Sequence, residues 1–395
     1  MSNPNLFSKQ YLLTAGPTPL PPRVLSIASE PILYHRAPAF VDIYERVLAN
    51  LPRVFQTSNQ VLVFGSSGSG GMESAAANLI VPGDNVIVAS CGKFGQRWAQ
   101  LAEAFGANLH HLEFEWGTPV DPAAIGNKLD EIDGPVKAVF TTFSETSTGV
   151  LNDVKAINEI VTAAGSILVV DAVSGLGAAN LPQDEWGIDV VVAGSQKALM
   201  CPPGLGFASV SPKALEIAAQ NPGRRFYFDW EKTAKGQAKG NSPFTPAVSL
   251  FMALDVALNM ILEEEGLENV FARHAVLAKA ARAGIKAIGL ERFGPDNPDA
   301  NVVTAAWLPE EIEGAKVPGR MRDVYGVTIA GGQDHLKGKI ARIAHCGYFG
   351  GFDIITALTA LEMALRDLGF DVTPGSGAGA AEQVFAEHGS VPQPA

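Results

Sequence analysis

Two polar residues, Asp171 and Lys197, each follow an apolar run of the kind that forms a buried strand. The run 167–170 (ILVV) ends at Asp171, and the run 190–193 (VVVA) leads through a three-residue turn to Lys197. In an open α/β sheet, ligands bind at the carboxyl ends of the parallel strands. An amine that forms a Schiff base and an acid that pairs with a pyridinium nitrogen are what pyridoxal phosphate (PLP) requires of its protein. The pair therefore predicts a PLP site with Lys197 and Asp171 as its catalytic residues.

The surroundings of Lys197 favour chemistry over an ordinary surface role. A lone lysine is most often solvated, and a lone aspartate after a strand is often a helix N-cap. Lys197, however, follows an apolar strand and precedes the apolar segment 198–204 (ALMCPPG). A charged amine in such a setting has a lowered pKa, which suits imine formation and proton transfer.

A glycine-rich turn supplies the third part of the predicted site. Residues 65–71 (GSSGSGG) follow a short apolar strand and open a helical segment. Free amides at a helix N-terminus bind anions, so Ser69, Gly70 and Gly71 are predicted to hold the cofactor phosphate. The alternatives are a flexible turn or a dinucleotide fingerprint, but the third glycine of GxGxxG is missing at the required offset.

Arg342 is the predicted substrate-binding residue. It lies in the strand-like segment 338–345 (GKIARIAH), where alternation places it on one face with Ile340 and Ala344. A bidentate clamp on a substrate carboxylate fits this arginine, and the alternative is an edge-strand arginine paired with a surface acid. The adjacent Cys346 would imply desulfurase chemistry, but nothing in the sequence favours a lowered thiol pKa.

The coarse pattern along the chain indicates an α/β fold. Apolar strand-like runs alternate with helical segments of about ten residues, which is typical of βαβ units and a mostly parallel sheet. The seven expected strands are 61–64, 85–89, 108–114, 138–142, 167–170, 189–193 and 206–210.

Four segments are expected in the chain. Residues 1–22 form a Pro- and Gly-rich N-terminal arm, and 23–255 form the large α/β domain. Residues 256–373 do not repeat as βαβ units and are predicted to form a smaller α+β domain. The tail 374–395 lacks core-forming residues, so we expect it to be disordered.

Composition restricts the partners. The net charge is −12, with 41 acidic and 29 basic residues, which disfavours nucleic acid and anionic membranes. No apolar run reaches the roughly 18 residues that span a bilayer, and no secretory signal is expected at the N-terminus. The three cysteines form no CxxC pair, so we expect reduced thiols, no metal site and a cytoplasmic location.

Several segments, taken together, resemble class V aminotransferases of the alanine–glyoxylate and serine–glyoxylate (serine–pyruvate) group. The resemblance spans about residues 11–370. The matching segments are 13–18 (LTAGPT), 67–73 (SGSGGME), 92–97 (GKFGQR), 144–149 (SETSTG), 171–177 (DAVSGLG), 194–199 (GSQKAL) with 202–204 (PPG), and 339–343 (KIARI).

The resemblance implies PLP fold type I, in which the large domain carries a mostly parallel seven-stranded sheet. It also implies a homodimer whose partner subunit completes each active site. The implied cofactor contacts are Lys197 as the Schiff-base amine, Asp171 at the pyridine nitrogen, Phe94 and Val173 on the two ring faces, Thr146 at the phenolic oxygen, and Ser69, Gly70 and Gln196 at the phosphate. Thr245 is the implied cross-subunit phosphate contact, and Arg342 and Gly16 are implied substrate-binding residues. The family often has tryptophan where this chain has Phe94, and either ring offers a flat apolar face.

The implied activity is transamination by a ping-pong mechanism. A small amino acid, alanine or serine, gives its amino group to a small 2-oxo acid, glyoxylate or pyruvate. His35 and Arg36 resemble a pair that binds the substrate phosphate in phosphoserine aminotransferases, so aspartate or phosphoserine is an alternative donor. Two further alternatives are a PLP lyase or cysteine desulfurase that uses Cys346, and a non-enzymatic nucleotide-binding module on a Rossmann-like sheet.

Overall fold

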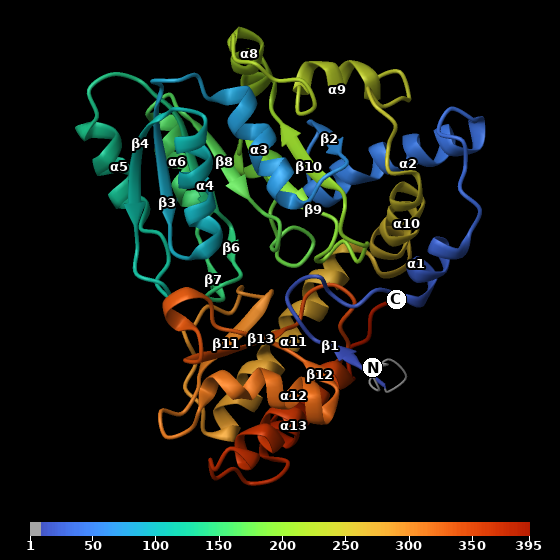
Figure 1. The fold of residues 1–395 in the computed structure, drawn as a ribbon, viewed down its shortest axis with the longest axis vertical. Coiled ribbons are helices and arrows are strands. Elements are labelled where there is room, and N and C mark those ends of the chain that lie inside the picture. The colour runs from blue at the N-terminus through green and yellow to red at the C-terminus, as the bar shows by residue number, and fades with distance from the viewer. Residues whose placement is uncertain (1–8) are drawn as a thin grey trace, which may run out of the picture.

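The structure is a computed structural model that describes residues 9–395, and a seven-stranded sheet dominates its larger part (Figure 1). The strand order is β2-β10-β9-β8-β5-β3-β4. The strands are β2 (Gln60–Phe64), β3 (Asn85–Ser90), β4 (Asn108–Glu113), β5 (Val136–Thr142), β8 (Ile167–Asp171), β9 (Val190–Gly194) and β10 (Gly206–Val210). Only β10 runs antiparallel to its neighbours. The predicted α/β fold with a mostly parallel seven-stranded sheet is therefore confirmed.

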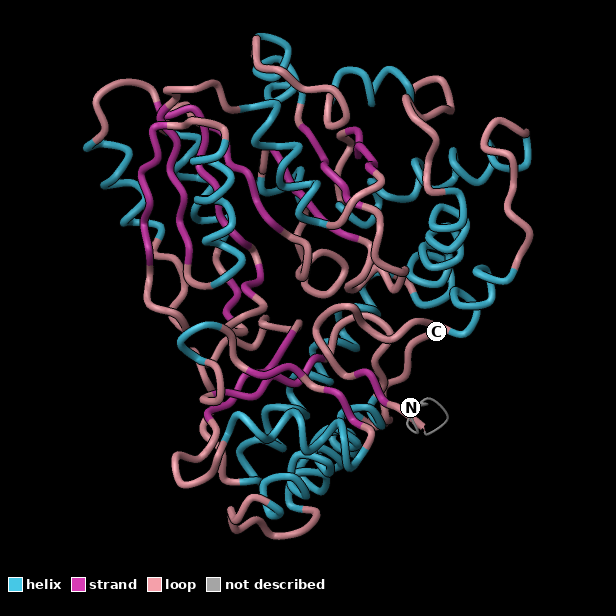
Figure 2. Tube along the Cα trace, in the orientation of Figure 1, coloured by secondary structure: helices cyan, strands magenta, loops and turns pink. Residues whose placement is uncertain are grey.

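Helices cover both faces of this sheet because its strands are apolar on both sides (Figure 2). In β2, Val61 and Val63 pack in one apolar cluster, whereas Leu62 and Phe64 pack in another on the opposite face. The first cluster includes residues of α2 (Pro38–Phe55), α5 (Pro122–Glu131), α6 (Val154–Ala163) and α10 (Val248–Asn259). The second includes residues of α3 (Gly68–Leu79), α4 (Lys93–Ala104), α8 (Pro212–Gln220) and α9 (Trp230–Gln237).

The C-terminal part has its own apolar cluster around a small sheet of order β11-β14-β13. Its elements are α11 (Leu267–Ile288), β11 (Val303–Trp307), α12 (Val317–Tyr325), β12 (Val327–Thr328), β13 (Ala330–Gly331), β14 (Ile340–Ala344) and α13 (Gly351–Asp367). A π-helical turn, Met260–Glu265, connects α10 to α11. This α+β organisation agrees with the smaller C-terminal domain that the sequence predicts.

The N-terminal arm joins the two parts of the molecule. Residues 1–8 of the predicted arm lie outside the described residues, and β1 (Tyr11–Leu12) pairs in parallel with β12. Farther along, the Thr18 hydroxyl donates to the carbonyl of Lys197 at 3.0 Å. The arm then enters α1 (Pro22–Ser26). It therefore runs from the small sheet region to the turn that carries the predicted catalytic lysine.

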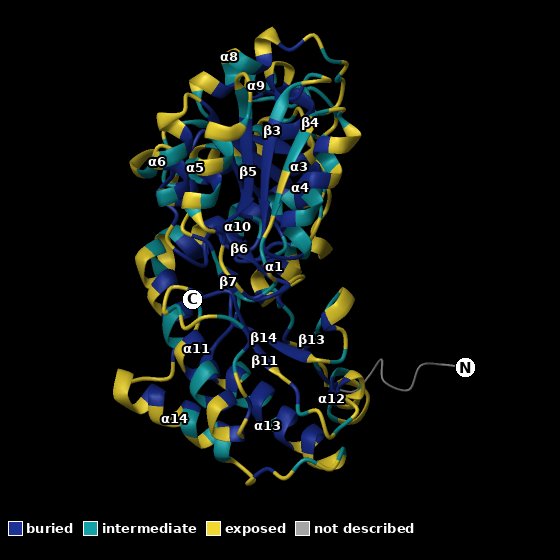
Figure 3. Cartoon of the chain, turned by 90° about the vertical axis from the view of Figure 1, so that its left-hand side faces the viewer, coloured by how far each residue is buried: buried dark blue, intermediate teal, exposed yellow. Residues whose placement is uncertain are grey.

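The expected disorder of the tail is wrong for most of that segment. Residues Ser376–His388 form helix α14, which packs on α11 and α13 (Figure 3). Ala381, Val384 and Phe385 are buried, and their three- and four-residue spacing gives the helix an apolar face despite its glycine- and alanine-rich sequence. The domain boundaries at 22/23, 255/256 and 373/374 stay predictions. No helix within residues 9–395 has the length and apolar character needed to span a membrane.

Candidate active site

A cavity of about 260 Å³ lies at the carboxyl ends of β8 and β9. These strand ends face the C-terminal part of the molecule (Figure 1). Ligands of open α/β sheets bind at this edge. Eight predicted site residues line the cavity: Gly16, Ser69, Phe94, Thr146, Asp171, Val173, Gln196 and Lys197. Residues far apart in the sequence thus meet in one place, as the strand-end argument predicts.

Two neighbouring strands bring Lys197 and Asp171 together. Asp171 ends β8 and lies opposite Val192 of the parallel strand β9. The turn after β9 is held by the Ser195 hydroxyl, which donates to Pro202 O at 2.6 Å, and by Met200 N, which donates to Lys197 O at 3.0 Å. The Lys197 amine donates a hydrogen bond to the carbonyl of Ala15 in the N-terminal arm. The side chains of Asp171 and Lys197 are both buried, and each has a hydrogen bond to the backbone.

Burial changes the ionisation of both groups. It lowers the pKa of Lys197, while the nearby Cys346 and Asp171 oppose the change. Burial also raises the pKa of Asp171 to about 6, and a 2.8 Å hydrogen bond from Val173 N opposes that rise. A lowered pKa increases the fraction of the amine that is neutral, and therefore able to attack a carbonyl, at neutral pH. Asp171, in turn, would gain from a cationic partner in the cavity.

The start of α3 forms one end of the cavity. Ser69 Oγ accepts a hydrogen bond from Arg97 Nη1 at 2.9 Å, and both residues line the cavity. Gly70 and Gly71 are buried just behind it, and the Gly70 amide donates to Ser67 O at 2.9 Å. The side-chain oxygen of Gln196 is buried and bonds to none of the described residues. An amide that can rotate to present its nitrogen, beside a helix N-terminus, suits a phosphate.

Phe94 and Val173 are the apolar members of the cavity lining predicted at the ring faces. The Lys197 amine lies 6.0 Å from the centroid of the Phe94 ring, and the Arg97 guanidinium lies 5.2 Å from it. Val173 packs against Gly68, where a Cβ would lie only 2.6 Å from a Val173 methyl. An aromatic ring and a branched aliphatic side chain suit the two faces of a flat heterocycle.

Arg342 does not line the cavity but is bonded to Thr146, which does, and it is held by backbone carbonyls. Its Nη1 donates to Thr146 O at 2.6 Å, and its Nε donates to Gly331 O at 2.9 Å. Burial lowers the pKa of Arg342 to about 10, so the side chain stays cationic at neutral pH. The alternative of an edge-strand arginine does not hold, because β14 is the central strand of its sheet. Arg342 forms no ion pair with any described acid.

Two predicted site residues lie elsewhere in this chain. Thr245 is exposed and lines a different cavity together with Tyr227 and Phe244. Arg36 is exposed, and its Nε lies 3.3 Å from Nε2 of the neighbouring His35. Neither lines the cavity around Lys197, so their predicted roles depend on a second subunit and stay predictions.

Sequence reasoning gave no role to two residues of this region, Arg97 and Glu145. An arginine three positions after Phe94 on a helix lies on the same face, and this spacing was the available signal for Arg97. Glu145 is fully buried and accepts hydrogen bonds from the first turn of α4. Its contacts join residues about 50 positions apart, which no local pattern indicates.

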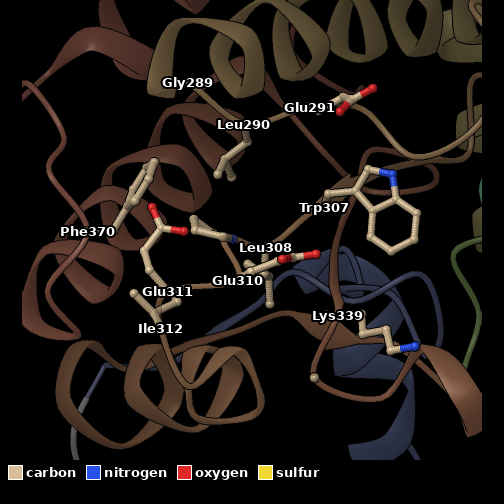
Figure 4. A pocket seen from close by; sticks show the side chains of 12 residues that line it. Gly289, Leu290, Glu291, Trp307, Leu308, Glu310, Glu311, Ile312, Lys339 and Phe370 are labelled. Atoms are coloured by element: carbon tan, nitrogen blue, oxygen red, sulfur yellow. The ribbon is translucent and has the colours of Figure 1, made fainter.

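Two other cavities are larger, and neither is lined by any of the predicted site residues. One of about 720 Å³ lies in the C-terminal part, where Glu291, Glu310 and Glu311 share its lining with Trp307 and Lys339 (Figure 4). Another of about 870 Å³ lies between the sheet region and α11. Among residues 9–395, no group of three or more His, Cys, Asp or Glu side chains is arranged to hold a metal ion.

We identify the cavity around Lys197 as the candidate active site because of the groups that it contains. It has an amine for an aldehyde, an acid for a ring nitrogen and a helix N-terminus for a phosphate. These groups fit PLP, so the fold and the site define a PLP-dependent enzyme. The family model for class V aminotransferases matches residues 10–340. The chain therefore belongs to the class V aminotransferase family and is a PLP-dependent aminotransferase, which excludes the non-enzymatic nucleotide-binding module.

Three relatives illustrate the range of similarity. The soluble hydrogenase small subunit of Synechococcus sp. is 44% identical, covering 96% of this chain and 99% of that protein. The serine–glyoxylate aminotransferase of Methylorubrum extorquens is 37% identical, covering 96% of this chain and 97% of that protein. The crystal structure of ureidoglycine–glyoxylate aminotransferase from Bacillus subtilis matches with a TM-score of 0.91 at 33% identity, covering 96% of this chain and 98% of that chain.

Proposed function

We propose that the enzyme transfers the amino group of a small amino acid, alanine or serine, to a small 2-oxo acid, glyoxylate or pyruvate, by a ping-pong mechanism. The observation that carries this proposal is the hydrogen bonding of the Arg342 guanidinium. Two of its three nitrogens are bound by backbone carbonyls, and Nη2 bonds to none of the described residues. One guanidinium that keeps Nη2 for a ligand suits a substrate with a single carboxylate.

The other arginine at the cavity supports the same substrate class. Arg97 lines the cavity, but it lies on the Ser69 side, where the phosphate is proposed to bind. A dicarboxylate such as aspartate needs a second cation near its side chain, and the described lining offers no other arginine. Two of the relatives above are named for glyoxylate as acceptor, which supports a small 2-oxo acid in that role.

The proposed cofactor contacts rest on the cavity lining and, for Gly70 and Gly71, on their place at the start of α3 behind Ser69. When bound, PLP supplies an aldehyde that takes the amino group and an electron sink that lets the Cα proton leave. Ser69, Gly70, Gly71 and Gln196 are proposed to hold the phosphate. Phe94 and Val173 are proposed to enclose the ring, Thr146 to reach its phenolic oxygen, and Asp171 to keep its nitrogen protonated.

Lys197 is proposed to act both as the tethering amine and as the group that moves the proton at the substrate Cα. Its lowered pKa increases the fraction of neutral amine, which is the form that attacks an aldehyde and accepts a proton. The Ala15 carbonyl orients this amine through its hydrogen bond. Gly16, which also lines the cavity, leaves room for the lysine and for a substrate beside it.

A homodimer is proposed because the predicted contacts of Thr245 and Arg36 are unmet within one chain. Both residues are exposed, and exposed aromatic side chains lie close by: Tyr34 is 65% exposed and Phe226 is 72% exposed. A partner subunit that covers this surface would bring these residues to the other active site. A cytoplasmic location is proposed from the three buried, unpaired cysteines.

The desulfurase alternative has little support from Cys346. This thiol is fully buried, and burial raises its pKa to about 11, although the nearby Lys197 opposes the rise. A sulfur acceptor needs an accessible thiolate. Full transaminase activity in Cys346→Ser would remove this alternative.

The test is a substrate panel on the PLP-loaded enzyme. Alanine, serine, aspartate and phosphoserine are each mixed with glyoxylate, pyruvate or 2-oxoglutarate, and product formation is measured. Alanine or serine alone should remove the visible absorbance of bound PLP, and glyoxylate or pyruvate should restore it. A preference for aspartate or phosphoserine, or no spectral change with any donor, would contradict the proposal.

A further inference from the structure

Glu145 is a fully buried carboxylate beside the cavity to which the proposed mechanism gives no role. It ends the short strand β6 (Ser144–Glu145). Its Oε2 accepts hydrogen bonds from Phe94 N at 3.0 Å and Gly95 N at 2.9 Å. Its Oε1 accepts from Ser147 N at 3.0 Å and from Ser147 Oγ at 2.6 Å. Each carboxylate oxygen of Glu145 therefore accepts two hydrogen bonds.

This donor set favours the ionised form of the side chain. Burial raises the pKa of Glu145, and its four hydrogen bonds oppose the rise. Three of the four partners are backbone amides, which can only donate, and the fourth is the Ser147 hydroxyl, which also accepts from Lys93 N at 3.0 Å. Two of these donors belong to the first turn of α4, where the helix dipole also favours a negative charge. Glu145 therefore acts as a buried anionic cap on α4.

The hydrogen bonds of Glu145 to α4 connect it to Phe94, on the proposed ring side of the cavity. Phe94 and Arg97 belong to α4 and line the cavity, and the first turn of α4, which contains Phe94, is hydrogen-bonded to Glu145. Gly92, just before the helix, packs so closely that a Cβ there would overlap both Glu145 and Ser147. The Glu145 carboxylate is therefore tightly packed against the backbone that carries the Phe94 ring.

The backbone after Glu145 connects it to Arg342, the proposed substrate-binding residue. Thr146 follows Glu145 directly, and its carbonyl accepts the 2.6 Å hydrogen bond from Arg342. The Thr146 hydroxyl is hydrogen-bonded to Ser174, which also lines the cavity. The charge of Glu145 raises the pKa of Arg342 against the effect of burial. The backbone that orients the arginine is thus continuous with the backbone of the buried acid.

We propose that Glu145 is a positioning residue that fixes the Phe94 wall of the cofactor cavity relative to the Thr146–Arg342 clamp. The inference rests on the proposed roles of Phe94, Thr146 and Arg342. A single carboxylate then sets the distance between the surface that carries the cofactor ring and the group that holds the substrate. Catalysis depends on this distance, because a misplacement of about 1 Å can cost about 10²-fold in rate.

The test compares Glu145→Gln with Glu362→Gln in the PLP-loaded enzyme. Glu362 is a matched control, because it is also buried and accepts the amides of Gly375 and Gly377, at 2.8 and 2.6 Å, at the start of α14. An amide has one acceptor oxygen, so each glutamine leaves backbone donors unpaired, and both variants should melt at lower temperature. Only Glu145→Gln should change the visible circular dichroism of bound PLP and lower kcat/KM for alanine by about 10²-fold.

Three results of this comparison would test the positioning role of Glu145. If Glu145→Gln has the circular dichroism of Glu362→Gln and a kcat/KM within about twofold of it, the positioning role is overturned while the proposed function stands. If the wild-type protein gives no visible band with PLP, the proposed function falls and the inference falls with it. If Glu145→Gln does not fold, Ser147→Ala replaces it, because it removes one donor to the same carboxylate. An unchanged spectrum and kcat/KM in Ser147→Ala would then overturn the inference, and a loss in both would support it.

Discussion

Gly16 lies against the side chain of Lys197 so closely that a Cβ on Gly16 would overlap Cε of the lysine. The backbone of Gly16 also has a φ of +139°, which side-chain-bearing residues rarely adopt. The N-terminal arm and Lys197, the proposed catalytic lysine, are therefore closely packed against each other. This fit would explain a glycine in the arm without any direct contact between Gly16 and substrate.

The substitution Gly16→Ala should displace the Lys197 amine. We expect kcat/KM to fall by about 10²-fold, because a methyl group would occupy the space of the lysine side chain and the altered backbone would shift the Ala15 carbonyl that orients it. The control is Gly319→Ala in α12, where a Cβ meets open space. The prediction fails if Gly16→Ala retains the activity of the control.

Arg97 links α4 to α3 through its hydrogen bond to Ser69, and its charge lowers the pKa of Asp171. Removing the charge in Arg97→Gln should weaken PLP binding by about tenfold, which corresponds to about 1.4 kcal/mol. Titration of the apoprotein with PLP, followed by absorbance, measures this affinity. Arg320→Gln, which breaks an exposed ion pair with Asp367, should bind PLP as the wild type does. Equal affinity in both variants would show that Arg97 plays no part.

Asp171 should make the stability of the apoprotein depend on pH. Burial raises its pKa from 3.8 to about 6, so the folded protein keeps a proton that the unfolded chain loses. This stabilising contribution is complete below about pH 4 and is lost as the pH rises through about 6. Asp171→Asn carries no charge, and its apoprotein should therefore melt several degrees above the wild type at pH 7.

The same comparison has an internal control. The difference in melting temperature between Asp171→Asn and the wild type should shrink as the pH falls from 7 to 4. With PLP bound, the asparagine variant should be nearly inactive, because a neutral amide cannot hold the ring nitrogen in its cationic form. A wild-type apoprotein that is more stable than the variant at pH 7 would contradict the assignment of a destabilising buried charge.

Arg36 distinguishes the possible donors. It is exposed and lies outside the cavity of its own chain, so it can act only on a neighbouring active site. If it binds a side-chain anion, Arg36→Ala should raise KM for aspartate or phosphoserine at least tenfold and leave alanine unchanged, as judged from initial rates with glyoxylate. An equal loss for all donors would remove a selective role for this residue.

Much of the candidate site could be predicted because it depends on local chemistry at strand ends. Asp171 and Lys197 follow long apolar strands, and the rule that ligands bind at this edge of a parallel sheet brings them together. Ser69 follows from the glycine-rich start of a helix. The two ring neighbours, Phe94 and Val173, came from resemblance, since neither stands out by residue type.

The parts that the sequence did not predict depend on contacts between distant segments. Glu145 acquires its place only when the loop after β5 meets the first turn of α4. Helix α14 was missed because Gly and Ala dominate its first half, and only Ala381, Val384 and Phe385 supply its apolar face. The roles of Thr245 and Arg36 depend on a second subunit, whose surface no pattern within one chain describes.

The most direct test of the account is to reduce the PLP-loaded enzyme with borohydride and to locate the label by peptide mass spectrometry. Borohydride converts a Schiff base into a stable secondary amine, so the reduced phosphopyridoxyl group stays on the residue that held it. The account predicts that the label lies on the peptide containing Lys197 and that Lys197→Ala carries none. A label on another lysine, or no label on a protein that has bound PLP, would contradict it.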